Sequence, residues 1–176
     1  MDSTCSITSK LCLACGICCN GVLFRDVELH PGDDARALES LGLPLERLRT
    51  KTRFAQPCAA LCPDNRCRLY ADRPHQCQAF ECALFKKVAE RQVELDAALR
   101  AIRRALRLAD RVKQLLRELG DSDEALALAR RFRRTKRRLE DRGADEASAA
   151  CFAELSLAVH DLNLLLRREF YPESGD

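Results

Sequence analysis

The chain has 176 residues, with 11 cysteines, no tryptophan and 5% aromatic residues, and its 32% charged residues give a net charge of +3. Because large aromatic side chains are scarce, a core built on them is excluded, and the core must come from leucine, alanine and bound metal. The charge is divided unevenly. Residues 86–142 carry 18 Lys/Arg against 10 Asp/Glu, whereas the rest of the chain carries 12 against 17.

The first half of the chain, residues 1–85, contains ten of the cysteines and five of the six prolines and predicts short elements between turns. Short strands are expected at residues 22–24 and 27–29. Asp34 is placed to cap a helix that runs from about residue 35 to Gly42. A further helical turn is expected over residues 43–48, and residues 51–82 are predicted to be loops.

After residue 85, apolar residues recur every three or four positions, which is the period of amphipathic helices. The pattern predicts three helices, with Asp121 as the N-cap of the second, over about residues 86–119, 121–141 and 145–170. The short connections favour an antiparallel bundle. The predicted fold is therefore mainly α: an irregular cysteine-rich metal-binding module, residues 1–85, packed as one body with an antiparallel bundle of about three long helices, residues 86–176.

The most informative motif is C-x-x-C-x-x-C-C, formed by Cys12, Cys15, Cys18 and Cys19. Thiolates at three-residue steps return to the same point and can wrap one soft metal centre or cluster. Neighbouring side chains point apart, so the doublet of Cys18 and Cys19 is easier to explain if its two thiolates serve different metal atoms. The motif therefore predicts metal binding.

Disulfides are the competing use for so many cysteines, and they depend on the cellular compartment. The N-terminus shows no basic region followed by an apolar segment, as a signal peptide would, and we expect no segment long enough to span a membrane. We therefore expect a cytoplasmic protein, whose thiols stay reduced and bind metal.

A second group of cysteines lies between residues 58 and 82 and is accompanied by Tyr70, the pair Arg73-Pro74 and Phe80. Together with the first motif, this order of residues resembles the CxxCxxCC family of zinc- or iron-chelating proteins (YkgJ-like), over about residues 12–82. The resemblance implies chelation of zinc or iron. Because relatives include the flagellin lysine-N-methylases, it also implies a link to cluster-dependent modification of peptides. Cys62 and Cys82 are additional to the simplest pattern of the family.

Nine cysteines are candidate metal ligands: Cys12, Cys15, Cys18, Cys19, Cys58, Cys62, Cys67, Cys77 and Cys82. Nine thiolates exceed the four that one ion or a common cubane needs, so two centres or one larger polynuclear cluster account better for the count and for the doublet. A third thiolate at the next three-residue step is typical of ferredoxin-type loops. An iron–sulfur cluster is therefore favoured over zinc, although both accept the same thiolates.

Several other residues have a functional and an ordinary interpretation. Arg73, with Tyr70 nearby, either hydrogen-bonds to a ligand thiolate and offsets its charge or forms an ordinary salt bridge. His75 is expected to be an exposed turn residue. Cys5 is expected in a terminal tail, and Cys151 is expected as a small core side chain of the last helix.

No phosphate-binding glycine loop, dinucleotide fingerprint, HExxH pair or nucleophile elbow is present, so any catalysis would have to occur at the metal centre. Residues 130–138 contain seven cations in nine positions, and we expect the helical bundle to bind a protein or peptide partner. Nucleic acid is a weaker candidate partner, because aromatic residues are scarce between the cations.

We therefore predict a metal-binding protein that holds an iron–sulfur cluster or a polynuclear thiolate centre, for redox chemistry or for metal-dependent modification of a partner. One alternative is a structural zinc module whose basic helical bundle docks protein or nucleic acid. Another is metal storage or trafficking.

Overall fold

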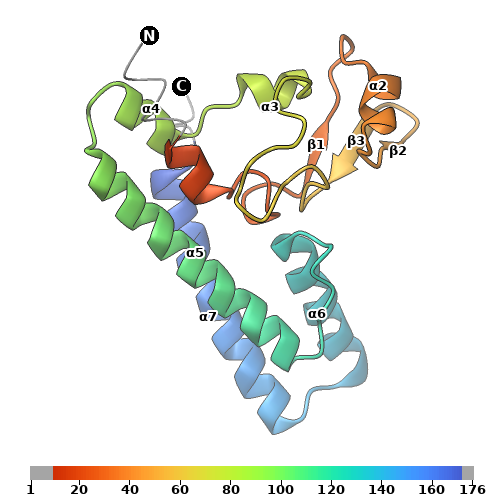
Figure 1. The fold of residues 1–176 in the computed structure, drawn as a ribbon. Helices are drawn as coiled ribbons and strands as arrows, with labels where there is room; N and C mark the ends of the chain where they lie inside the picture. Colours follow the sequence, from red (N-terminus) through yellow and green to blue (C-terminus); the bar gives the residue numbers. More distant parts are fainter. Residues whose placement is uncertain (1–9, 172–176) are drawn as a thin grey trace.

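The computed structural model describes residues 10–171, in which two long helices form an antiparallel arm and a cysteine-rich part with a small sheet lies at one end of that arm (Figure 1). Residues 10–15 are helical. The elements that follow are β1 (Asp26–Glu28), α2 (Ala35–Ser40), β2 (Glu46–Arg47), β3 (Thr52–Ala55), α3 (His75–Ala79), α4 (Ala83–Ala89), α5 (Leu95–Glu118), α6 (Leu128–Arg142) and α7 (Glu146–Glu169). The prediction of a mainly α fold is confirmed. Cys5 lies outside the described residues.

The three short strands form one antiparallel sheet in the order β1-β3-β2. Phe54 of β3 is 1% exposed and pairs in register with Val27 of β1, so the sheet buries one apolar row. On its other side Arg53 contacts Asp26 at 3.2 Å and Glu46 at 2.9 Å, which links all three strands. The buried side chains of this part form a small core of their own: Val27, Leu38, Leu43, Phe54, Ala60 and Leu69.

The predictions for the cysteine-rich part were partly wrong. The helix capped by Asp34 is present, and the Asp34 carboxylate accepts the N–H of Ala37 at 2.9 Å. Residues 22–24 form no strand, and residues 43–48 contain β2 in place of a helical turn. The segment predicted as loops contains β3 and α3. β3 pairs with β1, which is distant in sequence, and with the two-residue β2 across a short turn. Strands this short depend on cross-strand contacts and leave little local pattern.

The helix expected over residues 86–119 is also two helices, α4 and α5. Between them Arg91 has a positive φ of 60°, and the N–H groups of Gln92 and Val93 turn back to the carbonyl of Lys87. The apolar period continues across the break because α4 and α5 face the same core, in which Leu84 is 1% exposed. Sequence periodicity therefore identified the buried face correctly and missed the break.

The helix predicted over residues 121–141 is α6, which begins at Leu128, so the N-cap predicted at Asp121 was wrong. The carboxylate of Asp121 is buried and accepts the Nε–H of Arg131 at 3.0 Å in place of capping a helix. The end of α6 at Gly143 agrees with the prediction. The last helix, α7, is capped by Asp145 and packs Leu155, Leu162 and Leu166 into the core.

The helices and the cysteine-rich part share one large core. Leu11, Ile17 and Leu23 from the N-terminal segment pack with buried residues of α4, α5 and α7. The main helical contact is between α5 and α7, and α6 lies against α5 (Figure 1). The first helical turn of α6 lies beside the N-terminal segment, where the Leu128 N–H donates to the carbonyl of Gly21 at 3.0 Å.

One described helix, α7, is long and apolar enough to cross a membrane by length and composition alone. We had expected no segment of that length. Core helices that are mostly buried pass the same test, but only 22% of the apolar stretch of α7 is buried. The buried residues of α7 are leucines: Leu155, Leu162, Leu165 and Leu166.

Candidate metal centre

One group of thiols lies against the large core. Cys15, Cys18 and Cys82 all pack on it, the first two from the N-terminal segment and Cys82 from the residue that precedes α4. Partial desolvation and the neighbouring Cys82 raise the pKa of Cys12, although Cys12 as a residue is exposed. The first thiol group therefore contains Cys12, Cys15, Cys18 and Cys82: three thiols at three-residue steps and a fourth from a distant point in the chain.

Another group of thiols lies against the small core. Cys58, Cys67 and Cys77 all pack on it. Cys19 is tied to this side because its carbonyl accepts the N–H of Cys58 at 2.8 Å. Burial and, after it, the charges of Cys58 and Cys67 raise the pKa of Cys19 to about 11. The second thiol group therefore contains Cys19, Cys58, Cys67 and Cys77.

The doublet lies at the boundary between the two groups. Burial is the largest cause that raises the pKa of Cys18, and Cys82 and Cys15 of the first group come next. For Cys19 the thiols that follow burial are Cys58 and Cys67 of the second group. Cys18 packs on the large core with the first group, whereas Cys19 packs on neither core, and its strongest thiol neighbours belong to the second group. The charge of Cys19 also raises the pKa of Cys15 and Cys18, so the two groups are close neighbours at the doublet.

Glycine 16 shapes the turn that separates Cys15 from the doublet. Its φ is +62°, a conformation that favours glycine, and a Cβ on it would lie 2.4 Å from Oδ1 of Asn65. Asn65 belongs to the loop between Cys62 and Cys67, and its amide donates to the carbonyl of Leu13 at 3.0 Å. Asn65 therefore holds the loop against the turn, and a side chain at residue 16 would displace Asn65.

Burial raises the pKa of these thiols and so disfavours their thiolate form unless a cation is bound. It raises the pKa of Cys15 to about 12 and that of Cys77 to about 12, and neighbouring thiolates add to both shifts. Backbone N–H groups oppose the effect at Cys15, Cys58 and Cys82. Ala60 donates to Sγ of Cys58 and Phe85 donates to Sγ of Cys82, each at 3.4 Å. Such N–H···S contacts commonly surround metal-bound thiolates.

The chemistry of the donors fits a thiophilic metal, because each group offers four sulfur atoms and the ten described cysteines are free thiols. Within residues 10–171, however, no set of three or more Cys, His, Asp or Glu side chains stands where it could hold an ion without moving. Binding would have to draw the thiols of a group together, as is usual where metal binding and local folding are coupled.

Arg73 lies near both thiol groups. Its charge lowers the pKa of Cys12, Cys19 and Cys77, partly opposing the effect of burial. Its guanidinium stands 3.9 Å from the centre of the Tyr70 ring and donates to the carbonyl of Tyr70 at 3.1 Å. Arg73 forms no salt bridge among the described residues, and its hydrogen bonds go to the carbonyls of Tyr70 and Cys77, so its role beside the thiols stays a prediction.

Two of the predicted cysteines have other surroundings. Cys62, like Cys12 and Cys19, packs on neither core, and its N–H bonds to the carbonyl of Arg66 within its own loop. Its role as a ligand stays a prediction, as does that of the other eight. Cys151 is half-buried against the large core, and its thiol donates to Glu118 at 3.8 Å. That position agrees with the core role expected of it.

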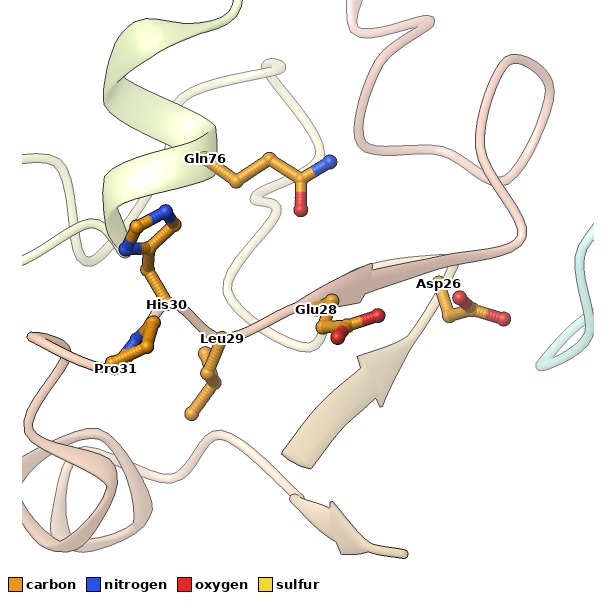
Figure 2. A pocket seen from close by; sticks show the side chains of 6 residues that line it. All are labelled: Asp26, Glu28, Leu29, His30, Pro31 and Gln76. Carbon is orange, nitrogen blue, oxygen red and sulfur yellow. The ribbon is translucent and has the colours of Figure 1, made fainter. Parts of the chain in front are cut away.

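A polar pocket of about 460 Å³ lies beside β1 and contains no cysteine (Figure 2). Glu28 and His30 line it from the strand side, and Gln76 reaches toward it from α3. The ring of His30 lies against that of His75, with 4.8 Å between their centroids. Both lining carboxylates are paired, Asp26 with Arg53 and Arg130 and Glu28 with Lys51, and no metal-holding set of side chains is found there among the described residues.

Fold and site together define a cysteine-cluster metal-binding protein with a helical arm. The chain belongs to the CxxCxxCC family, described as "Putative zinc- or iron-chelating domain", whose model matches residues 11–98, half of the chain. The match includes all nine predicted ligands and ends within the first turn of α5. Searches of curated proteins and of solved structures gave no match.

Proposed function

We propose that the chain holds two thiolate metal centres of four cysteines each, joined at the doublet of Cys18 and Cys19. The observation that carries this proposal is the division of the thiols between two separate cores, three on each. A division of nine thiols into two sets of four leaves Cys62 outside both. The centres would serve redox chemistry or the metal-dependent modification of a partner protein, in a cytoplasmic setting that keeps thiols reduced.

We favour an iron–sulfur cluster for the first group. Ferredoxin-type loops bind one cluster with three cysteines at three-residue steps and a distant fourth cysteine. In two-cluster ferredoxins, the fourth cysteine of the same run binds the other cluster. Cys19 would take that second role here. Zinc remains the alternative for either group, because tetrahedral zinc accepts the same four thiolates.

The partner surface is proposed on α6. A groove of about 600 Å³ runs along this helix and is lined mainly by arginines: Arg130, Arg133, Arg134, Arg137, Arg138 and Arg142. Some of them are engaged, since Arg130 contacts Asp26 and Arg134 contacts Asp121 and Asp123. Arg133 and Arg137 are exposed and form no salt bridge within the described part of the chain. Arginine forks bind carboxylates in pairs of hydrogen bonds, so an acidic protein segment is the partner that we propose.

The experiment that tests the centres is anaerobic purification followed by analysis of iron, zinc and acid-labile sulfide per chain. Several irons with matching sulfide and a brown absorbance would support the cluster. Zinc alone without colour would leave two structural zinc sites and remove the redox proposal. A metal content that follows the growth medium, including uptake of Cu(I), would point to storage or trafficking.

The division into two groups is tested by single substitutions away from the doublet. Cys15→Ser should remove the metal of the first group and Cys77→Ser that of the second, each leaving the other centre bound and spectroscopically unchanged. Cys62→Ser is the matched control and should keep both centres. If Cys15→Ser and Cys77→Ser each removed all metal, one shared polynuclear cluster would replace the two centres.

The partner surface is tested with labelled probes. Binding of a polyglutamate peptide should fall at least about tenfold when Arg133 and Arg137 are both replaced by Glu. Arg36→Glu, the same charge change on the exposed face of α2, is the control. Tighter binding of a single-stranded oligonucleotide than of the peptide would make nucleic acid the partner.

A further inference from the structure

The last helix, α7, carries apolar side chains on two opposite faces. One face contains Leu155, Leu162 and Leu166 and is buried against the rest of the protein. The other contains Leu157 and Leu164, which are 67% and 55% exposed. A helix that is apolar on both sides is normally covered on both sides. We therefore expect a partner to cover the exposed face that contains Leu157 and Leu164, called the outer face below.

The exposed face follows a seven-residue repeat. Ala150, Leu157 and Leu164 are seven residues apart, and the exposed Ala153 lies between the first two. Exposed charged residues stand at the two ends of the same face, Glu146 in the first turn of α7 and Arg168 in the last. This stripe has leucine and alanine on both sides of the exposed Asp161 and opposite charges at its two ends, where Arg168 also contacts Glu169 at 2.8 Å. A helix–helix seam has a similar form.

The pattern of this face is complementary to itself in one arrangement. If two copies of α7 pack antiparallel about a two-fold axis at Leu157, residues whose numbers add to 314 lie opposite each other. Ala150 then faces Leu164, which sets a small residue against a large one, and Glu146 faces Arg168. A parallel arrangement would instead place Glu146 against Glu146 and Arg168 against Arg168.

We propose that the outer face of α7 is the interface of a homodimer in which two α7 helices pack antiparallel about a two-fold axis through Leu157. A two-fold axis is the commonest symmetry of protein oligomers and uses the same patch on both subunits. The small Ala150 and Ala153 allow the two helices to approach closely. Insertion of this face in a membrane is disfavoured, because His160 and Asp161 interrupt it near its middle.

The interface is small. One helix face on each side buries on the order of 1,000 Å² in total, which is the lower limit for a specific complex. Area alone does not set affinity, and for a small interface of this kind we expect a weak dimer with a dissociation constant in the micromolar range. This inference does not depend on the identity of the metal, because none of the proposed ligands lies on α7.

The experiment is sedimentation velocity of the reduced, metal-loaded protein from about 1 µM to about 200 µM, a range that spans the expected dissociation constant. Wild type should shift from monomer to dimer over this range. Leu157→Glu sets two carboxylates against each other at the axis and should raise the dissociation constant at least about a hundredfold. Far-UV circular dichroism would verify that this surface variant stays folded.

The register is tested by exchanging the charges at the ends of the seam. Glu146→Arg alone and Arg168→Glu alone each turn two attractive pairs into repulsive ones, and each should weaken the dimer about tenfold. The double variant restores both pairs and should return to within about threefold of wild type. A monomer at the highest concentration, a dimer unaffected by Leu157→Glu, or a double variant no better than the single ones would each overturn the proposal. Binding of wild type to neutral lipid vesicles in place of self-association would also overturn it.

Discussion

Replacing Asp121 with alanine should destabilise the protein strongly. Asp121 lies in a loop, but its side chain is buried, unlike the other loop carboxylates that form ion pairs at the surface. The side chains of Asp121 and Arg131 are 0% and 1% exposed, and Nε of Arg131 lies 3.0 Å from the carboxylate. Arg134 holds the other carboxylate oxygen at 2.8 Å. The substitution therefore leaves the Arg131 guanidinium inside the protein without its counter-ion.

The expected cost follows from that burial. Removal of one partner of a buried ion pair typically costs about 3–5 kcal/mol, because the remaining charge is desolvated and unpaired. The whole stability of a domain is about 5–15 kcal/mol, so the variant should lose a large fraction of it. Part of the contact survives, since Arg131 also donates to the backbone carbonyl of Asp121 at 2.7 Å. Arg134 is 43% exposed and can return its charge to water, so the cost falls mainly on Arg131.

Urea denaturation of the metal-loaded protein, followed by far-UV circular dichroism, measures this loss. The matched control is Asp123→Ala, which breaks the exposed pair with Arg134, 44% and 43% exposed, and should cost at most about 1 kcal/mol. Replacing the buried pair together, Asp121→Leu with Arg131→Met, should recover most of the stability. A loss below about 1 kcal/mol in Asp121→Ala would refute the reasoning, because it would show that water reaches Arg131.

The same residue predicts how stability depends on pH. Burial opposes the ionisation of Asp121, but hydrogen bonds from Arg134 and Arg131 outweigh it and hold the pKa of this carboxyl below its usual range. A lowered pKa contributes stability that is complete above the unfolded value, about 3.9, and is lost as the pH falls through the folded value. The wild type should therefore lose more stability than Asp121→Ala when the pH is lowered below about 4.

Three further predictions concern the thiols. Gly16→Ala should reduce metal content, because a Cβ at this positive φ would overlap Asn65; unchanged loading and stability would show that the turn can shift. Cys151→Ala should keep all metal and cost at most about 2 kcal/mol, and a loss of metal would make Cys151 a ligand. Arg73→Gln should release metal at a higher pH in an acid titration, since Arg73 lowers the pKa of Cys12, Cys19 and Cys77 and protons compete better without it. Arg66→Gln, which alters an exposed arginine paired with Asp64, should leave that titration unchanged, and equal shifts in both variants would remove the role given to Arg73.

Local sequence signals predicted the parts of the fold that depend on local interactions. Asp34 caps the helix that it was expected to cap, and its carboxylate accepts the N–H of Ala37, three residues later. Asp121 carries the same signal and fails, because Arg131 and Arg134, ten and thirteen residues further along, compete for its oxygens. A capping pattern in the sequence identifies a carboxylate that can accept hydrogen bonds. Which groups donate to it also depends on residues further along the chain, here Arg131 and Arg134.

For the metal site, the sequence supplied nine candidate ligands, which stay a prediction, and it said little about how these thiols are divided between the two cores. The doublet of Cys18 and Cys19 indicated two metal environments, but spacing alone offered no way to assign Cys67 or Cys82 to either. Cys82 follows the second cysteine motif in sequence yet packs on the large core with Cys15, because it directly precedes α4. The assignment depends on where the two cores lie, and those are properties of the fold.

The segment that follows Cys18 and Cys19 contacts the start of α6, the helix that carries the proposed partner surface. The carbonyl of Gly21, two residues after the doublet, accepts the N–H of Leu128 at the start of α6. A Cβ at Gly21 would lie 3.0 Å from the Cα of Ala127, so the backbones approach closely there. One turn further along, Arg130 of the groove contacts Asp26 of β1. Metal binding at thiolate sites is coupled to local folding. Loss of metal should therefore weaken the contacts that Gly21 and Asp26 make with α6. We expect the arginines of α6 to bind the partner less tightly as a result, although none of them contacts a thiol.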